Sequence, residues 1–423
     1  MKTSDKRGRE MKIKLFLILL LIALGTVLMA DIPELRRIEN VRSKEAMYNH
    51  EIIEEYDFDK SVKFVRLTKP ELRDSGTLSI VSLPISPRGG LPNIRYSFDN
   101  NLNPTRVGND SLSLYVSKYG EYFVQQEFGE KEHTCFIHKK NGELVYSFSK
   151  EYQKDYPSKY PFAFSIGKIN DNGVLTYRIS NQEFHVLHND MTIKKIGPFY
   201  EEESLQFLRL GEYVLTTVLS LNGNIAIAAT ENRNIEPENY HSFPLGARVF
   251  FYDERSNFIK SYDIEGTEIP SPNVYSDSGR YFIMQCESYM YLFKDTELVL
   301  KEEVGGIGAV RFSEDESVAL VGTGVGNLVI DLENIEIKHN LGGLPGVTKA
   351  IANIGHPIIA TIISNRLYIV NYETEEVILS ETVGPKLRGG STSATHLEVS
   401  GDGKTISAFH RKWYRKYRIG GRK

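Results

Sequence analysis

The residues Val-Tyr-Ser-Asp-Ser-Gly-Arg-Tyr-Phe-Ile-Met at positions 274–284 show the pattern on which the fold of this chain depends. Two runs rich in β-branched, aromatic and other apolar residues flank a short polar turn that contains Gly279. Such runs favour pleated strands, and glycine supplies the positive φ that tight hairpin turns need. The stretch therefore predicts a β-hairpin.

Six other segments have the same form of strand, small polar turn and strand, with their turns at Gly120, Gly173, Gly223, Glu316, Gly355 and Gly403. The seven turns are 37 to 56 residues apart, and their mean spacing of about 47 matches the roughly 40 to 50 residues of a four-stranded blade. Each unit continues with a second pair of strands around a charged turn, as in residues 248–263, 327–339 and 367–379. We therefore predict an all-β, seven-bladed β-propeller, with six or eight blades as alternatives.

Two of the hairpins also resemble a known motif. Residues 399–406 (Val-Ser-Gly-Asp-Gly-Lys-Thr-Ile) and 275–282 are similar to the Ser-x-Asp-Gly-Lys hairpin of YVTN-type, TolB-like and WD-repeat-like β-propellers. The resemblance covers roughly residues 111–423. It implies the propeller fold but no particular activity, because this hairpin recurs in propellers with unrelated functions.

The last unit is too short to supply its own fourth strand, because the chain ends soon after Ile419. The β-prone run at residues 76–85 precedes the first unit, where a closing strand from the N-terminus would lie. We predict that this run closes a propeller made of residues 61–423. Residues 31–60 are predicted to form a spacer or a short helix, because their apolar residues have near-helical spacing.

The first thirty residues have the layout of a secretory signal. Lys12 and Lys14 precede a largely apolar run at residues 15–30. This run is shorter than the ~20 residues of a membrane-spanning helix. We predict cleavage after Ala30 and export to the periplasm or the cell exterior. The alternative is an uncleaved segment that anchors the protein in the membrane.

The charge of the remaining chain argues against nucleic acid as a partner. Without residues 1–30 the chain carries 45 Lys and Arg against 53 Asp and Glu, a net charge of −8. Such a chain does not attract a polyanion. The basic stretch 410–418 is interpreted as an outer strand whose Arg and Lys side chains cover aromatic rings. Contact with a membrane is expected only through residues 15–30, if they are retained.

Residues that could perform catalysis or bind a metal are scattered along the chain. Cys135 and Cys286 lie 151 positions apart within β-prone runs, where buried free thiols are expected. Side chains three or five positions apart point to opposite faces of a strand, and this applies to the histidine pairs closest in sequence, His133 with His138 and His185 with His188. We therefore predict no catalytic residues, no metal site and no cofactor.

The longest polar insertion, residues 231–244, is predicted to join the second and third strands of its blade. It would lie on the rim opposite the glycine hairpins, together with glycine pairs that leave the mouth of the ring open. Tyrosine, histidine and phenylalanine combine contact area with directional contacts. The candidate binding residues on this rim are Glu231, Arg233, Tyr240, His241, Phe243 and Arg388.

Three classes of function remain. The first is an exported, non-enzymatic propeller that binds an envelope protein, a peptide or a glycan, as a monomer or as an assembly subunit. The second is a propeller enzyme of the lactonase, hydrolase or quinoprotein type that uses Glu231, Arg233, His241 and Arg388. The third is an envelope-assembly subunit anchored by an uncleaved N-terminus. The first is favoured because the sequence shows no converging acid, base, nucleophile or metal ligands.

Overall fold

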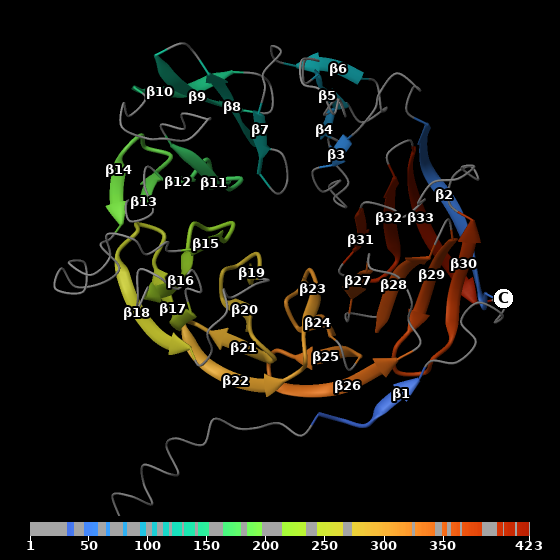
Figure 1. The fold of residues 1–423 in the computed structure, drawn as a ribbon. Coiled ribbons are helices and arrows are strands. Elements are labelled where there is room, and N and C mark those ends of the chain that lie inside the picture. The colour runs from blue at the N-terminus through green and yellow to red at the C-terminus, as the bar shows by residue number, and fades with distance from the viewer. Residues whose placement is uncertain are drawn as a thin grey trace, which may run out of the picture.

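In the part of the chain that it describes, the computed structural model consists of β-strands joined by turns and loops (Figure 1). No helix there is long and apolar enough to cross a membrane. The residues described are 32–37, 46–57, 65–67, 79–82, 94–98, 104–107, 113–117, 121–128, 131–139, 143–151, 164–178, 184–196, 214–233, 243–264, 273–323, 326–342, 349–352, 357–363, 366–382, 396–400, 402–410 and 413–422.

The strands form eight sheets that follow one another around a ring, and we number them as blades 1 to 8 in chain order. Blade 1 consists of β3 (Val65–Leu67), β4 (Ser79–Ser82), β5 (Ile94–Phe98) and β6 (Pro104–Val107), and blade 2 of β7 (Ser113–Val116), β8 (Tyr122–Phe128), β9 (Glu132–Lys139) and β10 (Leu144–Glu151). Blade 3 consists of β11 (Ser165–Ile169), β12 (Leu175–Arg178), β13 (Phe184–Leu187) and β14 (Ile193–Ile196), and blade 4 of β15 (Val214–Leu219), β16 (Ile225–Arg233), β17 (Phe243–Tyr252) and β18 (Phe258–Ile264).

Blade 5 consists of β19 (Asn273–Tyr275), β20 (Tyr281–Cys286), β21 (Tyr289–Lys294) and β22 (Glu297–Glu303), and blade 6 of β23 (Ile307–Phe312), β24 (Val318–Thr323), β25 (Asn327–Asp331) and β26 (Glu336–Gly342), with β1 (Leu35–Arg37) as a fifth strand. Blade 7 consists of β27 (Lys349–Ala352), β28 (Ile358–Ile363), β29 (Arg366–Asn371) and β30 (Val377–Thr382), and blade 8 of β31 (His396–Val399), β32 (Thr405–His410) and β33 (Trp413–Arg422), with β2 (Tyr48–Asp57).

The prediction of an all-β propeller is confirmed. Seven of the sheets have four antiparallel strands, and blade 6 has five strands because β1 pairs with it in parallel. Each of the seven repeats found in the sequence coincides with the first hairpin of one blade, from β7–β8 to β31–β32. Strands β3 to β6 form the further blade 1, so the described strands correspond to the eight-bladed alternative.

The ring is closed by β2, whereas the sequence had indicated residues 76–85. Strand β2 pairs antiparallel with β33 along its length, from Tyr48 opposite Arg422 to Asp57 opposite Trp413. Residues 79–82 instead form β4, which pairs with β3 and β5 inside blade 1. The spacer or short helix predicted for residues 31–60 was likewise wrong, because this segment contains β1 and β2.

Complementary charge explains why β2 pairs with β33. The acidic residues Glu51, Glu54 and Glu55 lie opposite Arg418, Lys416 and Arg415. The Arg418 guanidinium donates to the Glu51 carboxylate at 2.7 Å. Opposite charges across a strand pair stabilise it, and a shift of one residue would break the match. The basic strand predicted at the C-terminus therefore exists, but β2 covers its outer edge.

The hydrophobic core lies between neighbouring blades. In the sheet-centre strand β25 every residue is buried, whereas in the outermost strand β14 only Ile196 is buried. One cluster combines Tyr281 and Leu292 of blade 5 with Val321 and Leu328 of blade 6. The predicted buried thiols are confirmed, because Cys135 and Cys286 are both free and fully buried in different blades.

Candidate functional site

One rim of the ring carries the predicted binding insertion, and blade 4 shows how that insertion is built. Strand β15 begins at Val214 opposite Thr230, and pairing of β18 with β17 reaches Ala247. Beyond these positions β16 and β17 continue to pair only with each other, to Arg233 opposite Phe243. Residues 231–233 and 243–246, which we call the β16–β17 arm, therefore project past the two flanking strands of their sheet.

The structure places three of the six predicted binding residues in this arm. Glu231 and Arg233 lie on β16, and Phe243 begins β17 directly opposite Arg233. The insertion was predicted as a loop over residues 231–244, but its two stems are paired strands. The other three candidates, Tyr240, His241 and Arg388, lie outside the described residues.

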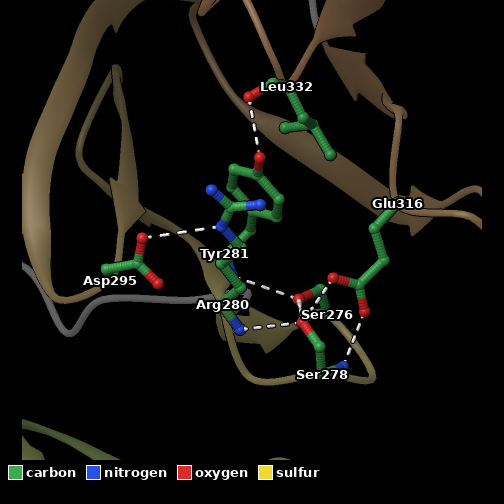
Figure 2. Close-up of polar contacts among 7 residues, drawn as sticks. All are labelled: Ser276, Ser278, Arg280, Tyr281, Asp295, Glu316 and Leu332. Atoms are coloured by element: carbon green, nitrogen blue, oxygen red, sulfur yellow. Dashed lines mark hydrogen bonds and ion pairs between the residues drawn. The ribbon is translucent and has the colours of Figure 1, made fainter.

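The opposite rim carries the turns between the first and second strands of the blades. The described turns of blades 2, 5, 6 and 8 share one construction, which Figure 2 shows for blade 5. In blade 5 the Ser276 amide donates to the Tyr281 carbonyl at 2.8 Å, and the Ser276 hydroxyl accepts from the Tyr281 amide at 3.1 Å. Gly279 has a φ of 73°. The same serine hydroxyl contact recurs at Ser117, Ser313 and Ser400.

These turns also bind one another across blade boundaries. The Ser117 hydroxyl donates to Asp171 at 2.5 Å, the Asn170 amide donates to the Ser220 carbonyl at 3.1 Å, and Asn222 donates to the Ser278 carbonyl at 2.5 Å. Figure 2 shows Glu316 of blade 6 accepting from the amide and the hydroxyl of Ser278 in blade 5. We call this chain of contacts, which links blades 2 to 6, the turn belt. It holds this rim rigid.

A cleft of about 600 Å³ opens between blades 3 and 4 on the turn-belt rim. At its base the His188 ring lies against the buried Ser256, with Nε2 3.1 Å from the hydroxyl oxygen. Burial lowers the pKa of His188, and the nearby Asp190 acts in the opposite direction. The residues lining this interblade cleft are Asn172, Val174, His188, Asn189, Asp190, Thr192, Ile193, Lys194, Asn222, Glu254 and Arg255.

Sequence reasoning missed both the belt and the cleft. A signal for the belt was present, because a serine or asparagine ends the first strand of almost every repeat. The cleft gave no such signal, because its walls come from four turns that are distant in sequence.

The strongest pKa shifts belong to buried side chains. Burial lowers the pKa of His133 to about 4 and raises the pKa values of the Cys135 thiol and the Tyr275 hydroxyl. The His133 ring stacks on Phe164 with 3.8 Å between the ring centroids. Within the described ranges no group of three or more His, Cys, Asp and Glu side chains could hold a metal ion. Burial is the cause of each of these three pKa shifts.

Neither a protein-family model nor a curated protein matches the chain. Solved structures do match it in fold. The C-terminal WD40 domain of Sif2 is 12% identical, with a TM-score of 0.50, and the match covers 89% of this chain and all of that domain. The Dos1 propeller is 13% identical, also with a TM-score of 0.50, over 88% of this chain and 95% of that one. The chain therefore has a WD-repeat-like β-propeller fold.

Proposed function

We propose that this protein is an exported, non-enzymatic binding propeller whose β16–β17 arm contacts the partner. The observation that carries the proposal is the pairing of residues 231–233 with 243–246 beyond both flanking strands. The sheet behind the arm is a fixed support, since Ile225, Ile227 and Val249 of its two central strands are fully buried. A projecting element on a rigid scaffold is a common way to present a binding surface.

The arm favours a protein or peptide partner over a glycan. Past Thr230 and Ala247 the two strands of the arm have no neighbouring strand among the described residues. Unpaired strand edges offer amide and carbonyl groups that an added peptide strand can pair with. The aromatic and charged candidates of the arm would then select the partner sequence.

Export rests on the sequence of residues 12–30. The expected exported chain begins at Asp31, directly before the first described residues. Intact mass measurement of the protein from its native host tests this start. A mass that includes residues 11–30 would favour the anchored assembly subunit instead.

Binding by the arm can be tested by removing it. Thr230 and Ala247 are directly paired, so an Asn-Gly turn can replace residues 231–246 without disturbing the sheet. We expect the shortened protein to unfold at nearly the same temperature, because loop length costs little, and to lose the partner that the full-length protein captures from envelope extract.

A matched control comes from blade 2, where Leu144 is an exposed apolar residue at the start of β10. The Leu144→Ser variant should capture the partner as the unaltered protein does. Equal capture by the arm-deleted protein would contradict the proposal.

A further inference from the structure

The interblade cleft lies on the rim opposite the β16–β17 arm, so the proposed partner contact leaves it unused. Four turns from two blades surround it: residues 170–173 and 188–191 from blade 3, and residues 220–223 and 253–256 from blade 4. Each contributes a polar side chain to the lining, namely Asn172, Asp190, Asn222 and Arg255. The turn belt ties the first-hairpin turns together, since Asn172 donates to the Leu221 carbonyl at 2.7 Å. The cleft is therefore a preformed site.

One wall of the cleft holds the ammonium group of Lys194, which lowers the pKa of the nearby Asp253 carboxyl but makes no ion pair with any described residue. The Lys194 ammonium group donates to Asn257 Oδ1 at 2.7 Å and to the Arg255 carbonyl at 3.3 Å. Both acceptors are neutral, and Lys194 forms no ion pair within the described part of the chain. These bonds fix the ammonium group between the two blades. A bound anion would complete its coordination.

The neighbouring Arg255 side chain has no hydrogen bond or ion pair with any described residue, and the same is true of Glu254 and Asn189. All three residues are exposed and line the cleft. A guanidinium group recognises a carboxylate through two parallel hydrogen bonds. Arg255 and Lys194 thus offer cationic donors for one carboxylate, and Asn189 offers an amide that can both donate and accept.

The acidic residues narrow the class of ligand. Asp190 and Glu254 offset the charge of Lys194 and Arg255 within the same lining. This balance disfavours phosphates and other multiply charged anions, whose repulsion by two carboxylates grows with charge. Among the described lining residues the only aromatic ring is the His188 imidazole, and no Trp, Tyr or Phe offers a sugar ring a broad stacking surface.

Of the three asparagine side chains in the lining, Asn172 and Asn222 already donate to the Leu221 and Ser278 carbonyls. The Asn189 amide remains, and its donor and acceptor match those of a peptide group.

We propose that the interblade cleft binds the carboxyl-terminal end of a short peptide. The terminal carboxylate lies between Lys194 and Arg255, and the preceding peptide group bonds the Asn189 side chain. The buried Val174 forms an apolar part of the cleft surface. Recognition of a terminal carboxylate by fixed donors is an established mode of peptide binding.

Trialanine and its carboxyl-terminal amide test this proposal on the exported chain, by calorimetry or NMR titration. We expect trialanine to bind. Its amide should bind at least about tenfold more weakly, because it lacks the carboxylate that accepts charge-assisted hydrogen bonds. The Arg255→Gln and Lys194→Gln substitutions should each weaken the binding of trialanine to a similar degree. Lys195→Gln, on the same strand but outside the lining, should leave its affinity unchanged.

Three results would overturn the proposal: no binding of trialanine at millimolar concentration, equal affinity for acid and amide, or binding of chitotriose in place of trialanine. Arg255 is exposed on a turn, so the Arg255→Gln variant remains informative even if Lys194→Gln disturbs the blade contact. The arm-deleted protein should still bind trialanine. A failure of the cleft to bind trialanine can thus be distinguished from a failure of the arm to bind its partner.

Discussion

Single residues in the hairpin turns stabilise the blades, because their side chains hydrogen-bond buried backbone groups or the adjoining turn. Ser276 is 1% exposed, and its hydroxyl satisfies the buried Tyr281 amide. In blade 6 Glu316 occupies the turn position of glycine with a φ of 55°, and its carboxylate bonds Ser278 of the adjoining turn. A non-glycine residue at positive φ costs energy, which this contact between blades offsets.

The Ser276→Ala variant measures what one such hydroxyl contributes. Alanine leaves the Tyr281 amide buried without its side-chain acceptor, so we expect the free energy of unfolding to fall by about 1–3 kcal/mol. Ser147→Ala, at an exposed position of β10, should change it by less than about 0.5 kcal/mol. Denaturant titration of both variants provides the comparison, and equal stabilities would refute the role of the buried serine.

His133 gives the fold a predictable sensitivity to acid. Burial lowers its pKa from 6.5 to about 4. Between these values the unfolded chain binds a proton that the folded chain does not, so stability is lost as the pH falls from 6.5 towards 4. His133→Gln removes this contribution.

We expect the native protein to lose on the order of 2 kcal/mol more than the variant between pH 7 and pH 4.5. Unfolding free energies at the two pH values test this. Parallel losses in both proteins would show that His133 titrates normally.

At the scale of elements, the inner hairpins could be predicted from sequence because local signals specify them. The turn glycine and flanking β-branched runs lie within about eleven residues of each other, as in residues 274–284. Strand β2 has no such signal, because its many glutamates resemble a solvated segment. The complementary basic strand lies more than 350 residues away. Blade 1 was predicted only as part of the eight-bladed alternative, because the long segment 68–78 separates β3 from β4 and residues 76–85 were assigned to closing the ring.

Truncation separates the contributions of the two N-terminal strands. We compare chains that begin at residues 31, 46 and 58. Loss of β1 removes a three-residue parallel pairing with β26 and the ion pair of Arg36 with Glu375 at 3.1 Å. Loss of β2 also exposes the whole edge of β33.

We expect the first truncation to lower the melting temperature slightly. The second should cost several kcal/mol, comparable with the net stability of a domain. A chain that begins at residue 58 and melts like the full chain would show that β2 does not close the ring.

At the scale of the whole molecule, the sequence could predict the ring but only part of the site. Repetition specifies blades, because each blade buries its faces only against its neighbours. The β16–β17 arm breaks the repetition, and the sequence located it as an insertion. Its strand pairing was missed because residues 231–246 have mainly polar, loop-like composition. The interblade cleft depends on how two blades meet, which no local pattern encodes.

Site-specific photo-crosslinking in the native host tests the central claim most directly. A photoreactive amino acid is placed at Arg233 in the arm and, as the control, at Ser147 on the outer strand of blade 2. A partner bound by the arm should crosslink at Arg233 and not at Ser147, in the exported fraction of the cell. Absence of any crosslink from the arm, or equal crosslinking from both positions, would contradict the assignment of this protein as a binding propeller that acts through its β16–β17 arm.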